Sequence, residues 1–198
     1  MTQGSPVDDP VSSEIIASVL AAPPTLGSGR LVCVDGPAGS GKTTLAAALV
    51  RAADGLRVDQ VHMDDVYEGW SGLEAGMSRV ATSVVAPLRS GRPGRYRRYD
   101  WLRSTWADER VVEPVDVLVV EGVGSGNSAY DDAITCLVWV VAPTDLRLAR
   151  GLERDGEAMR DQWLAWRDLE DAMFVRERTR ARADVVIDGT DGQPMTLT

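Results

Sequence analysis

Short apolar runs alternate with longer segments of helical periodicity along the chain. The apolar runs are strand-sized, and we expect buried strands at residues 31–34, 57–63, 115–120, 134–142 and 183–187. The intervening segments have helical spacing, and we expect helices ending near Leu20 and at residues 43–53, 73–88, 144–154 and 160–182. Strands that alternate with helices predict an α/β fold, a three-layer sandwich whose mostly parallel sheet is flanked by helices.

Prolines and glycines set several of the expected boundaries. Residues 21–24 read Ala-Ala-Pro-Pro and are expected to end the first helix. Pro87 is expected to end the helix at 73–88, and the following segment 89–98, rich in Gly, Pro and Arg, is expected to be non-helical.

We expect one domain over residues 1–198, because no internal repeat and no inter-domain linker is visible. Within it, residues 1–28 are expected to form an N-terminal leader and a short helix. Residues 145–180 are expected to form a lid and the C-terminal helix.

Composition and charge narrow the class of protein. The chain has 198 residues, 44% of them hydrophobic and 26% charged, as in ordinary globular proteins. A formal net charge of −9 disfavours nucleic acid or an anionic membrane as the main partner. No apolar run is long enough to cross a bilayer and no secretory signal is visible, so we expect a cytoplasmic protein. Cys33 and Cys136 lie in apolar runs and are expected to be small buried side chains.

Residues 36–43 match the phosphate-binding pattern G-x-x-x-x-G-K-[ST], known as Walker A, at every fixed position. An expected strand precedes the motif and an expected helix follows it. Glycines let the backbone turn its N–H groups toward phosphate oxygens. Lys42 would supply a compact charge for the β- and γ-phosphates, and the Thr43 hydroxyl would be a ligand for Mg²⁺. We therefore expect ATP and Mg²⁺ as cofactors, with nucleotide contacts from Gly36, Ala38, Gly39, Ser40, Gly41, Lys42, Thr43 and Thr44.

What the sequence lacks restricts the kind of P-loop protein. Lys42 is the only lysine, so the N-K-x-D guanine motif of GTPase switches is absent. The L-S-G-G-Q signature of transport ATPases is absent too, and the chain is too short for a motor or AAA-type module with its accessory domain. His62 is the only histidine and there is no cysteine cluster, which excludes zinc-site and Ser-His-Asp chemistry. A small-molecule kinase remains.

Five segments in order resemble the uridine kinase-like group of P-loop nucleoside and small-metabolite kinases. They are Val34-Asp35-Gly36 with the phosphate loop, His62-Met63-Asp64-Asp65-Val66-Tyr67, the stretch from Leu88 that ends in Tyr99-Asp100-Trp101, Leu118-Val119-Val120-Glu121-Gly122, and the arginines Arg147, Arg150 and Arg154. The resemblance implies a P-loop kinase with a helical lid that bears the arginines. It also gives Asp64 the role of base and implies acceptor contacts at Tyr99 and Trp101.

Reasoning from the residues alone assigns overlapping roles. Asp64 follows an expected strand, at the sheet edge where ligands bind in open α/β folds, and its carboxylate is suited to deprotonate an acceptor hydroxyl. Asp65 is the competing candidate. Glu121 ends the strand expected beside the phosphate-loop strand, where it would hold Mg²⁺ or a substrate hydroxyl. Arg150 and Arg154 have helical spacing and would stabilise charge on the transferring phosphoryl group.

Other prominent side chains have simpler expected roles. Tyr67 is expected to pack against the acceptor. His62 is expected to face away from the site, and Trp163 and Trp166 to pack in the core or at an interface. The arginines of residues 89–98 form the densest basic cluster, and we expect most of them on a solvated hairpin.

Two departures from uridine kinases affect the expected substrate. Ser104 stands near the position where those enzymes carry a base-reading histidine, and segment 68–72, which in the family bears an acidic residue for the ribose hydroxyls, is shortened. We therefore expect ATP-dependent phosphorylation of a small hydroxylated metabolite, with nucleosides as one candidate. One alternative is a nucleoside monophosphate or polynucleotide-end kinase that uses the arginines of residues 89–98, and another is a nucleotide-binding regulator with little turnover. The expected partners are ATP and a small acceptor; self-association into a homo-oligomer is left open.

Overall fold

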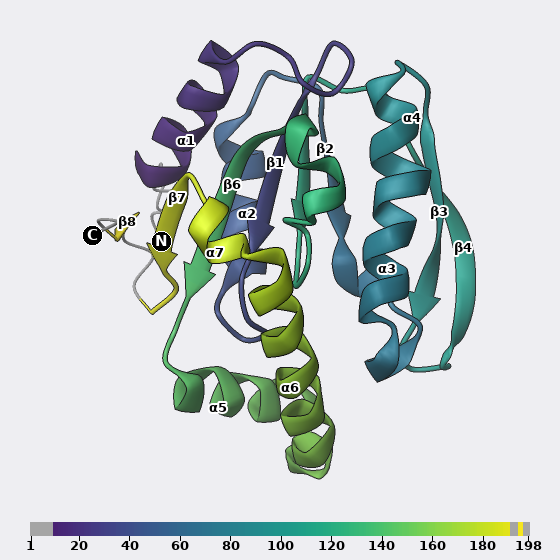
Figure 1. Cartoon of the computed structure of the whole chain (residues 1–198), viewed down its shortest axis with the longest axis vertical. Coiled ribbons are helices and arrows are strands. Elements are labelled where there is room, and N and C mark those ends of the chain that lie inside the picture. Colours follow the sequence, from purple (N-terminus) through teal and green to yellow (C-terminus); the bar gives the residue numbers. More distant parts are fainter. Residues whose placement is uncertain (1–9, 191–193, 196–198) are drawn as a thin grey trace, which may run out of the picture.

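The central sheet has the predicted parallel architecture (Figure 1). The computed structural model describes residues 10–190 and 194–195, so most of the expected leader lies outside the described residues. The strands are ordered β2 (Val58–His62), β5 (Val117–Glu121), β1 (Arg30–Asp35), β6 (Ile134–Val141) and β7 (Val185–Asp188), all parallel, with the short β8 (Pro194–Met195) antiparallel at the edge. This order confirms the expected neighbour relation of the strands that end in Asp35 and Glu121.

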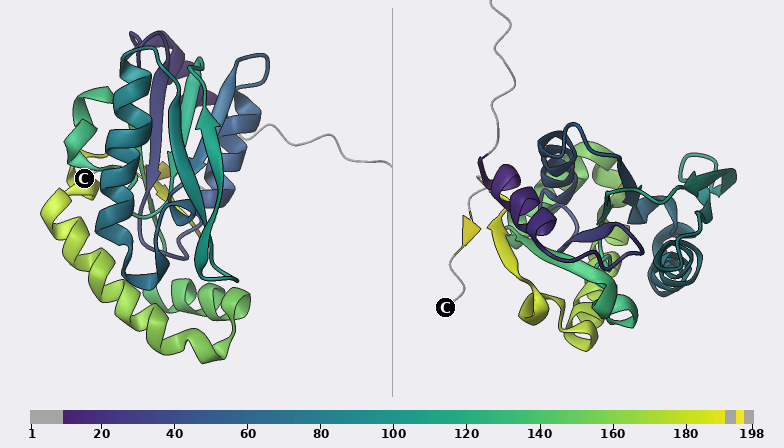
Figure 2. Two further views of the ribbon diagram at one scale, coloured as in Figure 1. Left: turned by 90° about the vertical axis from the view of Figure 1, so that its right-hand side faces the viewer. Right: turned by 90° about the horizontal axis from the view of Figure 1, so that it is seen from above.

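Helices cover both faces of the sheet (Figure 2). Alternate residues of β1 point to opposite faces, as in any pleated strand. Val32 and Val34 pack against α1 (Pro10–Ala21) and α2 (Lys42–Ala52), whereas Leu31 and Cys33 belong to the core under α3 (Leu73–Val80) and α6 (Arg160–Glu177). The three-layer prediction is therefore correct.

The helix that was expected to end near Pro87 continues to Arg89. It consists of α3, a π-helical turn at Ala81–Val85 and α4 (Ala86–Arg89) in direct succession. Pro87 lacks an N–H and would clash with the carbonyl four residues earlier in a regular helix. The wider turn immediately before it changes that spacing, which explains why the proline does not end the helix here.

A two-stranded antiparallel hairpin, which the sequence analysis did not anticipate as strands, follows this helix. It is formed by β3 (Gly94–Asp100) and β4 (Thr105–Val112) and lies beside α3 and α4 (Figure 1). Two arginines of β3 pair with carboxylates of the hairpin itself: Arg95 with Glu109 and Arg98 with Asp108, each at 3.0 Å. The expected solvated hairpin is thus the correct interpretation of most of this basic cluster.

The expected lid region lies beyond the carboxyl ends of the strands (Figure 1). It contains α5 (Thr144–Asp155), which is joined to α6 by a short 3₁₀ turn at Glu157–Met159. The helix expected at residues 160–182 is interrupted at Arg178, whose φ of 53° is left-handed, and resumes as α7 (Thr179–Arg182). Among the described residues, no helix combines the length and apolarity that crossing a membrane requires.

Candidate active site

The phosphate loop joins β1 to α2 and fits tightly against the lid side of the molecule. Gly36 has a φ of 140°, and a Cβ there would lie 2.1 Å from the carbonyl oxygen of Val140. Gly39 has a φ of 78°, and its Cβ would lie 2.5 Å from the carbonyl oxygen of Arg147 in α5. Both glycines are therefore required by the backbone conformation and by the space around it. The result is a fixed loop whose shape follows directly from the motif.

A cavity of about 700 Å³ opens at this loop. Of the eight residues expected to contact nucleotide, six line it: Ala38, Gly39, Gly41, Lys42, Thr43 and Thr44. Gly36 and Ser40 do not line it, because Gly36 packs against the backbone of Val140 and Ser40 is fully buried. Lys42 is only 7% exposed, and its Nζ donates to the carbonyl oxygen of Pro37 at 2.9 Å. The ammonium group is thus held over the loop.

Thr43 and Glu121 bring hard oxygen atoms together at one side of the loop. The Thr43 hydroxyl lies 3.3 Å from each carboxylate oxygen of Glu121, which is 5% exposed. Hydroxyl and carboxylate oxygens are the donors that Mg²⁺ prefers, and Mg²⁺ usually takes one or two carboxylates and keeps several waters. These two side chains therefore fit the magnesium site that the sequence predicted.

His62 does not face away from the site, and that expectation is wrong. Its Nδ1 lies 2.6 Å from Glu121 Oε1. The parallel register pairs His62 on β2 with Glu121 on β5, which brings the two strand ends together. The hydrogen bond that His62 donates to the Glu121 carboxylate raises the pKa of His62, although burial of the ring opposes this. His62 thus orients the candidate metal ligand from behind, a relation that depends on the sheet order and not on any local pattern.

Asp35 fixes the loop after β5 against the phosphate loop. One of its carboxylate oxygens accepts the amides of Gly36 and Gly124, at 2.7 and 2.9 Å, and the other accepts the amide of Gly126 at 2.8 Å. Burial raises its pKa to about 6, although these amide donors act to lower it. No role for Asp35 was expected from the sequence.

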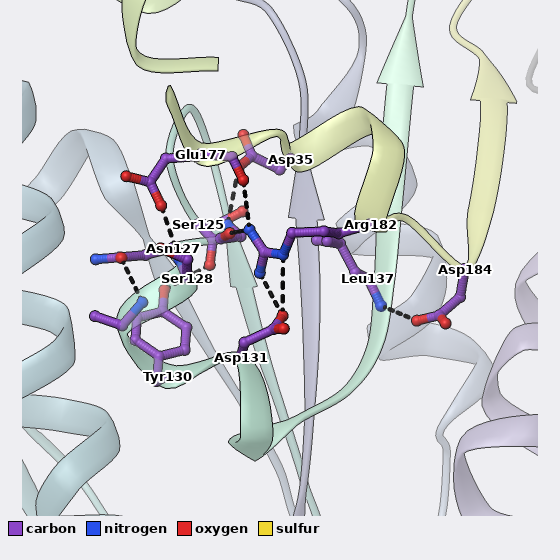
Figure 3. A network of polar contacts seen from close by, with 12 residues as sticks. Asp35, Ser125, Asn127, Ser128, Tyr130, Asp131, Leu137, Glu177, Arg182 and Asp184 are labelled. Atoms are coloured by element: carbon purple, nitrogen blue, oxygen red, sulfur yellow. Dashed lines mark hydrogen bonds and ion pairs between the residues drawn. The ribbon is translucent and has the colours of Figure 1, made fainter. Parts of the chain in front are cut away.

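Further polar contacts brace the same loop from the side of α6 and α7 (Figure 3). Arg182 donates to the carbonyl oxygen of Gly126 at 2.9 Å and pairs with Asp131. The amide of Ser128 donates to Glu177 at 3.0 Å. The residues that follow Glu121 are therefore held in place by both the sheet and the C-terminal helices.

The structure distinguishes the two adjacent aspartates. Asp64 lines the cavity, whereas Asp65 does not. Asp64 is exposed to the space inside the cavity, and the surrounding protein removes much of its hydration. This burial raises the pKa of Asp64, and the charge of Glu121 raises it further. Asp64 is thus the aspartate that faces the space beside the phosphate loop.

The three lid arginines differ in their positions and in their contacts. Arg150 and Arg154 line the cavity; Arg150 donates to the carbonyl oxygens of Gly39 and Gly189 at 3.3 and 3.1 Å, and Arg154 pairs with Asp155 at 2.8 Å. Arg147 lies behind the loop and does not line this cavity. Its resemblance to a lid arginine is therefore confined to its spacing.

Arg147 and Glu170 form a clamp on the phosphate loop that sequence reasoning missed. Glu170, 1% exposed in α6, pairs with Arg147 at 3.1 Å and accepts the amide of Ala38 at 2.8 Å. Trp166 donates its indole N–H to the same carboxylate at 3.1 Å. Burial raises the pKa of Glu170, against the opposing effects of the Ala38 amide and the Lys42 and Arg147 charges. The clamp joins α5, α6 and the loop.

Replacing Glu170 by Gln is expected to weaken both the fold and nucleotide binding. It leaves the buried Arg147 charge without its partner, which costs about 3–5 kcal/mol of unfolding free energy. It also weakens the acceptor for the Ala38 amide, so the ATP dissociation constant should rise about tenfold. Urea denaturation and a binding titration measure the two effects.

A double substitution, Arg147→Leu with Glu170→Leu, separates these effects. Removing both charges restores most of the stability, as replacement of buried ion pairs by apolar groups often does. The Ala38 amide still lacks its acceptor, so ATP affinity should stay low. Normal affinity in the double variant would show that the clamp supports the fold only.

Aromatic side chains form the far side of the cavity. Of the expected acceptor contacts, Tyr67 and Trp101 line it, together with Asp64 and Glu121. Tyr99 does not line it and packs behind Trp101 with ring centroids 5.6 Å apart.

Trp163 and Trp166 line the cavity as well, which the expectation of packing alone did not include. Their spacing of three residues on a helix was the signal in the sequence that they share a face.

Comparison with known proteins agrees with this arrangement at the level of the fold. No protein-family model matches the chain, and no curated protein matches it. Among solved structures, a "possible uridine kinase" from Bacillus stearothermophilus has a TM-score of 0.65 and 23% identity, covering 89% of this chain and 97% of its own.

Two further solved structures are similar. A "putative fructose transport system kinase" from Silicibacter sp. TM1040 has a TM-score of 0.58 and 22% identity, covering 81% of this chain and 94% of its own. D-glycerate 3-kinase from Cryptococcus neoformans has a TM-score of 0.55 and 13% identity, covering 98% and 99%. The sheet order, the phosphate loop and these neighbours together show that the chain has a uridine kinase-like P-loop kinase fold.

Proposed function

We propose that this protein is an ATP-dependent phosphotransferase that moves the γ-phosphoryl group of Mg·ATP to a hydroxyl of a small metabolite. The observation that carries the proposal is that Asp64, Lys42 and the lid residues Arg150 and Arg154 line one cavity. The similar folds include proteins named for kinase activity on small hydroxylated molecules, which supports the reaction class.

Charged residues that line the cavity have different roles in the proposed reaction. When bound, Mg·ATP supplies the phosphoryl group and leaves as ADP. Asp64 accepts the proton of the acceptor hydroxyl as its oxygen forms a bond to the γ-phosphorus and the bond from phosphorus to the β–γ bridging oxygen breaks. Lys42, Arg150 and Arg154 neutralise the charge on the phosphoryl oxygens.

The cation would be held by the Thr43 hydroxyl and the Glu121 carboxylate, which His62 orients.

Two alternative functions are less well supported. A nucleoside monophosphate or polynucleotide-end kinase would use the arginines of residues 89–98 on the acceptor phosphate. None of these arginines lines the cavity, and Arg89, Arg95 and Arg98 already pair with carboxylates. A regulator that only binds nucleotide has no use for a carboxylate with a raised pKa beside the phosphate loop.

The test is ADP release from Mg·ATP across nucleosides, nucleotides, sugars, vitamins and ring-bearing alcohols, with Lys42→Ala as the blank. An acceptor that raises turnover well above the blank, with the phosphoryl group recovered on it, establishes the kinase. ATP binding without acceptor-stimulated turnover over the whole panel contradicts the proposal and favours the regulator.

The pH dependence of kcat/KM for the acceptor is expected to report the titration of Asp64. The base must be deprotonated, so the rate falls as pH drops through its pKa. Burial and the Glu121 charge raise that pKa, so the acid limb of kcat/KM for the acceptor should lie at higher pH than the value of about 3.9 for a free aspartate. The measurement is kcat/KM between pH 4 and 9 at saturating Mg·ATP, with Asp64→Asn as control.

An acid limb that persists in Asp64→Asn belongs to another group, first of all Asp35, whose pKa burial raises to about 6. An unchanged limb in that variant would contradict the assignment of Asp64.

A further inference from the structure

Five aromatic rings form a continuous surface inside the cavity, here called the aromatic wall: Tyr67, Trp70, Trp101, Trp163 and Trp166. Trp70 lies at its centre, with ring centroids 5.6 Å from Trp101, 6.3 Å from Trp163 and 6.1 Å from Trp166. Tyr67 joins it through Trp166, at 5.2 Å. Trp70 lies in η2 (Gly69–Ser71) and Tyr67 just before it, Trp101 lies in the β3–β4 turn, and the other two rings lie in α6, so the wall is built from three separate parts of the chain.

The hydrogen-bond donors of this wall are nearly all engaged within the protein. Tyr67 donates its hydroxyl to the carbonyl oxygen of Val123. The indole N–H of Trp101 donates to the carbonyl oxygen of Asp64 at 2.8 Å.

The indole N–H groups of the two tryptophans on α6 also donate hydrogen bonds within the protein. Trp163 donates to Asp155 at 3.0 Å and Trp166 to Glu170 at 3.1 Å. Among the described residues of the wall, only the Trp70 N–H has no partner in the protein. The wall therefore presents ring surface and almost no unused donor to the cavity.

Beside the wall lie two apolar side chains and one charged pair, Arg154 with Asp155, whose members contact Trp163 and each other. Leu102, in the turn between β3 and β4, lines the cavity and is 99% exposed. Met159, before α6, also lines it and adds a flexible thioether side chain. An almost fully exposed leucine in the same cavity as the aromatic wall gives an apolar ligand further surface to contact.

Asp64 connects this apolar surface to the reacting end of the cavity. Its backbone carbonyl holds the Trp101 ring, while its side chain lies in the same cavity as Lys42 and Arg154. An acceptor whose hydroxyl reaches the Asp64 carboxylate thus has its remaining atoms next to the aromatic wall. Those atoms find mainly ring faces and apolar side chains, because the charged groups beside Trp163, Arg154 and Asp155, are paired with each other.

We propose that the acceptor is an alcohol whose non-reacting part is a planar aromatic or apolar ring, bound by contact with the aromatic wall. The inference rests on the proposed phosphotransferase function and names its substrate class. A sugar or a nucleoside demands many hydrogen bonds, and burying its polar groups against rings whose donors are engaged leaves them unpaired. A ring without polar edges incurs no such cost, because stacking on aromatic side chains needs only a flat face.

Binding can be measured apart from catalysis, because four tryptophans of the wall report on occupancy. The probes are 2-naphthylmethanol and benzyl alcohol, compared with uridine, fructose and glycerate, each with a non-hydrolysable ATP analogue and Mg²⁺. We expect saturable quenching of tryptophan fluorescence by the ring alcohols and at least tenfold weaker binding of the other three. In the coupled ADP assay, kcat/KM should follow the same order.

Variants of the central ring make the test specific. Stacking against an aromatic side chain is worth about 1–3 kcal/mol, so Trp70→Ala should weaken 2-naphthylmethanol binding by about 5- to 150-fold, and Trp70→Phe should restore part of it. The matched control is Trp106→Ala, because Trp106 packs on Arg79 and Tyr99 outside the cavity. Affinity for the ATP analogue, unchanged in all three variants, shows that each is folded.

The outcomes separate this inference from the proposed function. Uridine, fructose or glycerate binding more tightly than both ring alcohols, or Trp70→Ala binding 2-naphthylmethanol as well as the unmodified protein does, would overturn the substrate class and leave the phosphotransferase intact. Binding of ring alcohols that depends on Trp70, without phosphoryl transfer to any acceptor, would support the ring-binding site and overturn the phosphotransferase.

Discussion

Asp64→Asn is expected to lower kcat by about 10²- to 10⁴-fold while leaving ATP affinity unchanged, because a positioned general base contributes a factor of this size. Asparagine has nearly the same shape but cannot accept the proton of the acceptor hydroxyl. The Trp101 indole N–H donates its hydrogen bond to the backbone carbonyl of residue 64, so the Asp64→Asn variant retains this bond. The wall and the phosphate loop should therefore keep their positions in the variant.

Asp65→Asn is the matched control, one residue away and outside the cavity. Its carboxylate lies among the charges of His62, Arg98 and Arg110, which act to lower its pKa while burial raises it. We expect its kcat to stay within a few-fold of the unmodified protein. Single-turnover kinetics with the acceptor identified in the ADP-release panel measure the chemical step itself. A loss in Asp65→Asn that exceeds the loss in Asp64→Asn would reverse the assignment of the base.

The parts of the fold predicted from sequence are those that depend on local patterns. The apolar runs around Val32 and Val119 could only be strands buried on both faces, and the phosphate-loop motif prescribes its own strand, turn and helix. The parallel order then brought Glu121 beside the loop, as expected from the chain alone. Sequence thus predicted the layers of the fold and the position of Glu121 beside the phosphate loop.

The missed features depend on contacts between distant parts of the chain. Glu170 holds Ala38 across 132 positions, and His62 meets Glu121 across 59. In the sequence Glu170 does not differ from a solvated helix carboxylate, and nothing close to His62 in the chain indicates its partner. The two strands of the β3–β4 hairpin were not predicted, because charged outward positions outnumber the buried ones, such as Tyr96. The turn of this hairpin supplies Trp101, a predicted site residue, and Leu102, which was not predicted, to the cavity.

Lys42→Ala is expected to abolish most phosphoryl transfer, with a loss in kcat of at least about 10²- to 10³-fold, the usual effect of removing one group that stabilises transition-state charge. The ammonium is buried and lies over the loop. Its charge also acts to lower the pKa of Asp64, so its removal should move the acid limb of any residual activity to higher pH. Lys42→Arg should not restore the rate, since a planar guanidinium does not replace a compact ammonium in so confined a site.

The rest of the sequence allows a direct check of where this amine lies. Lys42 is the only lysine, so it is the only side-chain amine that an amine-reactive acyl phosphate of ATP can modify. We expect labelling at Lys42, protection by Mg·ATP, and no side-chain labelling in Lys42→Ala. Labelling that Mg·ATP does not protect, or full activity in the alanine variant, would mean that nucleotide phosphates do not reach Lys42. Because the probe reports binding without turnover, it distinguishes a loop that fails to hold ATP from one that holds ATP but cannot transfer its phosphoryl group.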